Sequence, residues 1–377
     1  IRDSENEKGA YVVKKEVFSN YILDLPKEAT FYDQKVNQIV SNQFEKDSVY
    51  WNTKEDQETK DLYETVNIVK ASKKIKAITG SIYILSDGYI PLFKGLQTGN
   101  IWTTVARNQV EGLRLRLGFR TFLSDSDRFR AEGYAAYGQR DKITKYGIEA
   151  RYLLSNLPRT TISGAYLNDY EQMGLTQFNG IHLLPEADKG SKALFVRGQN
   201  FFLSKIQKTM FRFDLEPTKN VHVGITFSHN IITSAAPNRF SLDYLDTKTG
   251  LTKSNTTDVA TDLYLTYTPG KEVSGFGVDE KKGIKLHPTL LFNYKRGYKN
   301  LMGGSFNYNR LQVLYNNPIS FGKIGVFDAT IGAGKTFEAT PLSLLTAVSS
   351  NQTYFLLPNT FALLDYCLLY TSPSPRD

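Results

Sequence analysis

The sequence predicts an all-β protein: an antiparallel transmembrane β barrel, preceded by part of a periplasmic region that contains one helix. Aromatic residues make up 13% of the chain, with 23 Tyr and 23 Phe, and such rings favour the pleated surface of a sheet. From residue 107 onward, segments of about ten residues alternate between apolar and polar side chains and are separated by turn residues. No stretch approaches the roughly 18 apolar residues of a membrane-spanning helix, whereas a barrel needs none.

Residues 1–106 form the predicted partial periplasmic region, because their pattern differs from that of the rest. The segment at about 54–76 is rich in charge, and Leu62, Val66 and Val69 recur at helical spacing. We therefore expect a helix at about 54–76. The glycine-punctuated stretch that follows, from Gly80 to Gly99, is expected to connect this helix to the barrel.

Residues 107–366 form the predicted barrel, whose strands separate charge from apolar side chains. No charged residue stands on the apolar side of the clear strands. The apolar side chains that we expect to face lipid are Leu113, Leu115, Leu117, Phe119, Ile148, Phe211, Phe213, Ile225 and Phe227. The charged side chains that we expect to face the lumen are Arg114, Arg116, Arg120, Arg128, Arg130, Glu132, Lys145, Glu149, Arg151, Arg212, Asp214 and Glu216.

Alternation alone does not say whether the apolar face meets lipid or a protein core. Small residues such as Ala131, Gly133 and Ala135 would fill a soluble core poorly, and strands of about ten residues match a tilted bilayer crossing. A charge on a lipid face costs roughly 2–4 kcal/mol at mid-depth, which explains why that face has none. Lipid is the favoured reading, and a soluble β-rich binding protein is the alternative.

Four segments resemble an outer-membrane β-barrel family of unknown function that carries an N-terminal carboxypeptidase-regulatory-like domain. They are NQVEGLRLRLGFRT (108–121), YAAYGQRDKITKYGIEARYLL (134–154), DSVYWNTKED (47–56) and NQTYFLLPNTFALLDY (351–366). The resemblance implies a location in the outer membrane of a gram-negative bacterium. It brings no catalytic residue and no cofactor. The resemblance implies that the chain is a fragment of a longer protein, so we expect a truncated barrel with about 11–12 strands of ~16, without the family's signal peptide, N-terminal domain and last strands.

Motifs for enzymatic or metal chemistry are weak in this sequence. The GAGKT at Gly332–Thr336 lacks the first glycine of a phosphate-binding loop, and we expect the end of a strand there. The four histidines are scattered and the single Cys367 cannot form a cysteine-based metal site. Ser228 and His229 suggest an outer-membrane lipolytic enzyme, but adjacent strand residues point to opposite faces. We therefore predict a protein that is not an enzyme and has no cofactor and no metal site. An outer-membrane lipolytic enzyme is the second alternative to this prediction.

The predicted function is non-enzymatic: a role in envelope transport, assembly or anchoring, with no known substrate. The net charge is +8, but the arginines alternate with apolar residues and share their face with Glu132 and Glu149, so a nucleic-acid partner is not expected. The expected partners are outer-membrane lipid and, as a further class, periplasmic proteins or peptides. The lumen charges would either plug the barrel by ion pairing or form an anion-attracting constriction.

The segment Cys367–Asp377, CLLYTSPSPRD, breaks from the preceding pattern. It resembles translated sequencing-adapter read-through, and we expect it to be an artefact; the alternative is a flexible tail rich in Pro and Ser.

Overall fold

The structure is a computed structural model that describes residues 68, 71–172, 201–246, 250–274, 277–279, 281–282 and 287–345. The chain divides into two compact units, Ile1–Lys76 and Ala77–Asp377. Of the first unit only residues 68 and 71–76 are described, so the fold below is that of the second unit, together with the helix that begins at its boundary.

The second unit is built on one sheet of 13 strands, most of them long. Its first strands are β1 (Tyr89–Phe93), β2 (Gly95–Gly99), β3 (Val105–Asn108), β4 (Gly112–Phe122), β5 (Phe129–Gly138), β6 (Thr144–Asn156) and β7 (Arg159–Gln172). The others are β8 (Leu203–Thr218), β9 (Val221–Ser234), β12 (Asn255–Tyr267), β15 (Thr289–Gly297), β16 (Tyr308–Ser320) and β17 (Val326–Thr336).

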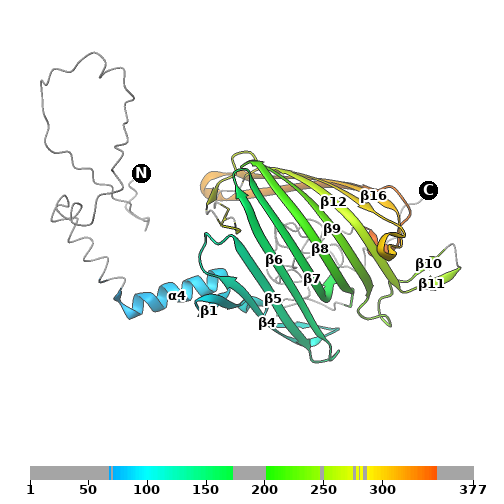
Figure 1. Ribbon diagram of the computed structural model, residues 1–377, viewed down its shortest axis with the longest axis horizontal. Coiled ribbons are helices and arrows are strands. Elements are labelled where there is room, and N and C mark those ends of the chain that lie inside the picture. The colour runs from blue at the N-terminus through cyan, green and yellow to red at the C-terminus, as the bar shows by residue number, and fades with distance from the viewer. Residues whose placement is uncertain are drawn as a thin grey trace, which may run out of the picture. The chain divides into compact units, whose positions relative to one another are not determined.

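Every strand pairing in the sheet is antiparallel, and strands pair with their next neighbour along the chain from β4 onward, apart from the short hairpins set into connections. At the start of the sheet, β2 and β3 share the free edge of β4. The sheet is curved, with β16 turning back behind β12 in Figure 1. Within the described residues β1 and β17 remain edge strands, so the sheet is not a closed barrel.

The all-β prediction is confirmed at this level: the described residues form a mostly antiparallel sheet with one α-helix. Two short hairpins lie outside the sheet, β10 (Tyr244–Asp246) with β11 (Leu251–Lys253), and β13 (Val273–Ser274) with β14 (Lys281–Lys282). Four 3₁₀ turns complete the elements: Ile101–Thr103, Leu301–Gly303, Gly322–Ile324 and Leu342–Leu344. The GAGKT segment ends strand β17, as expected.

The helix α4 (Lys73–Asp87) extends beyond the end of the predicted helix. The expected helix at about 54–76 falls largely outside the described residues, and residues 80–87, expected as part of the connector, are helical. The reason is that Ile78, Ile82 and Leu85 continue the helical spacing, and a single glycine costs a helix only about 1 kcal/mol. The helix ends at Gly88, whose φ of +77° suits a glycine C-cap.

The sheet also begins earlier than the predicted barrel boundary at residue 107. Strands β1 and β2 precede that position, β3 begins two residues before it, and all three are hydrogen-bonded into the same sheet. Their short lengths and glycines hide the alternation that identifies the later strands. Among the described residues no helix has the length and apolar character to cross a membrane. The segment 351–366, which resembles the outer-membrane family, and the segment 367–377 lie outside the described residues.

Candidate functional site: a buried charge network on one face of the sheet

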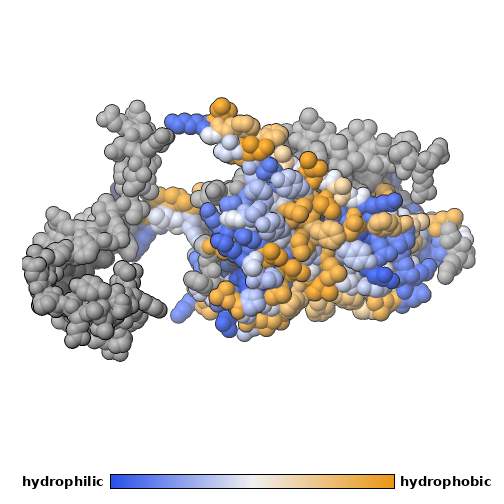
Figure 2. Space-filling model, turned by 90° about the horizontal axis from the view of Figure 1, so that it is seen from above, coloured by the Kyte–Doolittle hydropathy of each residue, from blue (hydrophilic) through white to orange (hydrophobic). Residues whose placement is uncertain are grey.

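The sheet buries its charged side chains and exposes its apolar ones, the reverse of an ordinary soluble fold. We call the face that carries Arg114 and Arg151 the inner face, and the face that carries Leu115 and Ile148 the outer face. Arg114 is 1% exposed, whereas its neighbour Leu115 is 53% exposed. Figure 2 shows hydrophobic side chains on the molecular surface over the sheet.

Most residues singled out from the sequence follow this division. Of the charged set, the buried members are Arg114, Arg130, Lys145, Glu149, Arg151, Arg212, Asp214 and Glu216. Those of intermediate exposure are Arg116, Arg120 and Glu132. Of the apolar set, the exposed members are Leu113, Leu115, Leu117, Phe119, Ile148, Phe211, Phe213 and Ile225, and Phe227 is of intermediate exposure. Arg128 departs from its expected place: it lies in the turn before β5 and is exposed, because strand alternation does not extend into that turn.

The centre of one cluster on the inner face is Asp169 of β7, which is fully buried. Arg114 of β4 donates two hydrogen bonds to its carboxylate, from Nη1 to Oδ1 at 2.8 Å and from Nη2 to Oδ2 at 2.9 Å. Arg114 also bonds Glu111 at 2.9 Å, and Lys145 of β6 lies 2.8 Å from the same Glu111 oxygen. Such a forked arginine–carboxylate pair is the strongest geometry available to a buried ion pair. The cluster therefore links β4, β6 and β7 through their side chains.

Tyr134 reaches Asp169 across an intervening strand. Its Oη on β5 donates to Asp169 Oδ2 on β7 at 2.6 Å, although β6 lies between the two strands. The residue of β6 directly opposite Tyr134 is Gly147. Because glycine has no side chain, the tyrosine ring can lie over β6 without a clash.

The same arrangement recurs twice further along the sheet. We call it a crossing: a tyrosine lies over a glycine of the adjacent strand and reaches a carboxylate on the strand beyond. Tyr264 of β12 is opposite Gly224 of β9, and its hydroxyl bonds Asp214 of β8. A Cβ on Gly224 would overlap the Tyr264 ring. Arg212 Nε donates to the same hydroxyl at 2.8 Å, so this crossing also includes a cation.

The third crossing joins β16, β15 and β12. Tyr308 is opposite Gly297, and its Oη donates to Asp258 Oδ1 at 2.8 Å. Lys295 Nζ lies 2.9 Å from Asp258 Oδ2. A Cβ on Gly297 would overlap the Tyr308 ring. Three times, then, a tyrosine crosses a glycine to reach a carboxylate that also holds a cation.

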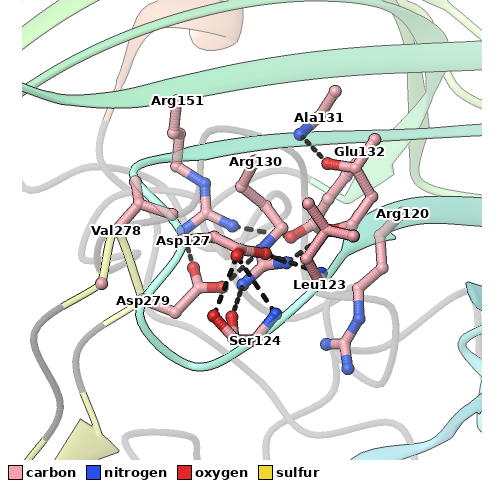
Figure 3. A network of polar contacts seen from close by, with 12 residues as sticks. Arg120, Leu123, Ser124, Asp127, Arg130, Ala131, Glu132, Arg151, Val278 and Asp279 are labelled. Carbon is pink, nitrogen blue, oxygen red and sulfur yellow. Dashed lines mark hydrogen bonds and ion pairs between the residues drawn. The ribbon is translucent and has the colours of Figure 1, made fainter. Parts of the chain in front are cut away.

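A second type of cluster forms where a connection folds onto the inner face (Figure 3). Residues 277–279, which we call the inward segment, belong to the connection between β12 and β15. Asp279 accepts from Arg130 Nε and from Arg151 Nη1, each at 2.7 Å. Arg159 donates to the backbone oxygens of Gly277 and Val278 at 2.9 and 2.8 Å. Residues more than a hundred positions apart in the sequence are therefore held together here.

The turn between β4 and β5 supports this cluster. Val278 N donates to the backbone oxygen of Asp127 at 2.7 Å. The Asp127 carboxylate accepts from the backbone N–H groups of Leu123 and Ser124 at 2.7 and 3.1 Å, and Arg130 lies 3.2 Å away. Burial raises the pKa of Asp127, but these hydrogen bonds and the nearby Arg130 outweigh it and hold that pKa below its ordinary value.

The network carries little net charge. Within the described residues, six buried cations stand against seven buried carboxylates. The cations are Arg114, Arg130, Lys145, Arg151, Arg212 and Arg310, and the carboxylates are Glu111, Glu149, Asp169, Glu171, Asp214, Glu216 and Asp258. The inner face is therefore close to neutral and is not a positively charged surface.

The described part of the chain offers no group of three or more His, Cys, Asp or Glu arranged to hold a metal ion. Ser228 is buried on β9 while His229 bonds the backbone oxygen of Met302 at 3.2 Å, so the two side chains face opposite ways. His222 instead lies 2.9 Å from Asp214 and joins the second crossing. His222 and His229 thus take part in local hydrogen bonding.

Several residues of the network were not singled out from the sequence. Asp258 stands on a strand whose alternation is clear, and Asp169 on one whose alternation is not, but the partners of both are two or three strands away, and pairing across that distance leaves no trace in local spacing. Asp279 lies in a connection and has no strand pattern at all. A usable signal exists for the crossings: Tyr134 and Tyr264 are large aromatic residues on the charged face of otherwise clear strands.

Comparison with known proteins gives one match. Residues 212–374 match the C-terminal domain of a family of unknown function, DUF5686. This agrees with the expected likeness to a family of unknown function. The match begins within β8, so it includes the crossings of Tyr264 and Tyr308 and excludes the cluster around Asp169. No curated protein and no solved structure matches the chain.

Proposed function

We propose that the chain is a non-enzymatic outer-membrane β-barrel protein of a gram-negative bacterium, with a role in envelope transport, assembly or anchoring. The observation that carries the proposal is the reversed burial of the sheet. Phe211 is 64% exposed and Ile148 59% exposed on the outer face, while Arg114 and Glu149 on the inner face are 1% exposed. Water penalises such an outer face, and lipid does not.

The length of the strands supports the same proposal. β6, β7, β8 and β9 have 13, 14, 16 and 14 residues. A tilted bilayer crossing takes about 9–11 residues, and strands of soluble proteins average about 5–6. Outer-membrane lipid is the first partner in this proposal, and periplasmic proteins or peptides are the second.

The charges of the inner face favour an interior filled by paired side chains and disfavour an anion-attracting constriction. Six buried cations and seven buried carboxylates nearly cancel, and the forked Arg114–Asp169 pair leaves little charge to attract an ion. A constriction selective for anions would need unpaired cations in contact with water. We therefore favour ion pairing that fills the interior along this part of the sheet, which suits assembly or anchoring better than diffusion of solutes.

The test compares two adjacent residues of β4 in the full-length protein. Leu115→Arg places a charge on the outer face and is expected to abolish membrane insertion, at a cost of roughly 2–4 kcal/mol. Arg116→Leu removes a half-buried inner-face cation, whose Nη1 donates to Thr103 Oγ1 at 2.5 Å, and is expected to leave insertion intact. Heat-modifiable gel migration measures insertion for both. Equal tolerance of the two substitutions would contradict the proposal and favour a soluble sheet.

A further inference from the structure

Helix α4 carries an exposed apolar stripe. Ile78 and Ile82 are each 60% exposed and Leu85 is 56% exposed. With Ile75 they follow each other at spacings of three, four and three residues, which places them along one side of the helix. A stripe of this kind normally packs against a core, yet here it faces outward.

The intrinsic stability of the helix in water is low. It has 15 residues, includes Gly80 and contains several β-branched isoleucines. Isolated helices of this length are marginal even in alanine-rich sequences, and glycine and β-branched residues weaken them further. An apolar surface that receives the stripe would supply the missing stabilisation.

The end of the helix is fixed beside other exposed apolar residues of the same unit. Trp102 Nε1 donates to the backbone oxygen of Leu85 at 3.2 Å, and Asp87 forms an ion pair with Arg120 of β4. Trp102 is 56% exposed, and Phe93 on the edge strand β1 is 66% exposed. The stripe therefore ends beside exposed apolar side chains at the edge of the sheet. Tryptophan at such a junction is typical of the membrane interface.

The charges of the helix indicate which kind of apolar surface receives the stripe. Its first turn holds Lys73, Lys74 and Lys76 and no acidic residue. At 100° per residue, Lys74 borders the stripe, so its stem can lie along it while its ammonium group reaches outward, whereas Lys73 and Lys76 lie on the other side of the helix. The one carboxylate of the helix, Asp87, is at the opposite end and is paired. Anionic headgroups complement this arrangement.

We propose that α4 lies in the plane of an anionic membrane surface beside the sheet, with Ile78, Ile82 and Leu85 among the upper acyl chains, Lys74 at the headgroups, and the positive charge of the lysine-rich first turn attracted to them. The inference rests on the proposed outer-membrane function and adds a second, independent membrane contact. It also assigns the exposed Trp102 to the same interface. The surface recognised is a lipid surface, not a protein groove.

The experiment places a fluorescent probe on each side of the helix in the full-length protein with Cys367 replaced by serine. Ile82→Cys labels the stripe, and Gly80→Cys labels the opposite side, where an added Cβ would meet no atom within 4 Å. Each is labelled with an environment-sensitive dye and reconstituted in phosphatidylcholine vesicles with or without phosphatidylglycerol. We expect a blue shift severalfold larger at residue 82 than at residue 80, quenched by brominated acyl chains.

The lysines are tested by replacing Lys73, Lys74 and Lys76 with glutamine in the labelled Ile82→Cys protein. The blue shift is expected to weaken in vesicles that contain phosphatidylglycerol and to change little in phosphatidylcholine alone. If the protein inserts by heat-modifiable migration but both probes report water, the inference fails and the proposed function stands. If insertion itself fails, the proposed function fails. A residue-82 probe already shielded without vesicles would mean that protein covers the stripe, and would overturn the inference.

Discussion

The cluster around Asp169 and the cluster around Asp279 use the same chemistry on the same strands, yet they connect different parts of the chain. Asp169 is fully buried and its partners lie on strands of the same hydrogen-bonded sheet. Asp279 is one-third exposed and comes from the connection between β12 and β15. The first cluster holds the sheet together, whereas the second holds a connection against it.

The two clusters also differ in how many carboxylate partners each cation retains when the central aspartate is removed. Arg130 and Arg151 keep other carboxylates if Asp279 is lost, since Arg130 also pairs with Asp127 and Arg151 with Glu132. Arg114 keeps only Glu111 if Asp169 is lost, and Lys145 shares that carboxylate. The comparison teaches that burial and redundancy together decide which ion pair the fold cannot spare.

The largest expected effect follows from removing the buried carboxylate. Asp169→Ala leaves Arg114 underpaired and the Tyr134 hydroxyl without its acceptor, so we expect a loss of about 3–5 kcal/mol in the free energy of unfolding. Urea unfolding of the vesicle-reconstituted protein measures it. Asp246→Ala, which removes the half-buried partner of the exposed Lys253 in the outlying hairpin, is the control and should stay near wild type. Equal losses of unfolding free energy in the two variants would contradict the claim that the buried Asp169 pair matters most for stability.

The next effect comes from filling a crossing. Gly224→Val puts side-chain atoms where the Tyr264 ring lies, and overpacking of this kind costs about 1–3 kcal/mol. Adding Tyr264→Ser should recover part of that loss, because it removes the ring. Gly164→Ala is the matched control: its Cβ would lie 3.6 Å from Phe211, an ordinary contact on the outer face. Additive losses in the double variant would show that the crossing has no energetic role.

The sequence predicted much of the sheet and only part of the network. Alternation along one strand predicts which face carries Arg114 and which carries Leu115, because strand side chains have a period of two. It cannot predict that Arg114 meets Asp169, because that contact needs the register of three successive pairings and the curvature of the sheet. Asp279 was beyond reach for a further reason: its connection has no period, and its partners lie more than a hundred residues away.

A smaller effect is expected from releasing the inward segment. Asp279→Ala should lower the free energy of unfolding by only about 1 kcal/mol, since its carboxylate is partly exposed and both arginines retain partners. Amide hydrogen exchange should rise locally at residues 277–279, because the hydrogen bonds of Val278 and Arg159 are no longer supported from Asp279. Glu272→Ala, on an exposed residue of the same connection, is the control. A global loss as large as that of Asp169→Ala would remove the distinction between the two clusters.

The smallest expected effect is a pH dependence at the turn between β4 and β5. The pKa of Asp127 is lower in the folded protein than its unfolded value of about 3.9, so its contribution is fully present above that value and is lost as the pH falls through the folded pKa. Protonation removes an acceptor from the N–H groups of Leu123 and Ser124 and weakens the turn that receives Val278. We expect faster exchange at residues 123–124 and 277–279 as the pH falls below about 4, worth less than about 1 kcal/mol. The acid-dependent increase should be absent in Asp127→Asn, whose amide does not titrate. A variant that retains the full increase would place the titrating group elsewhere, with Asp279 the first candidate because it faces the same arginine.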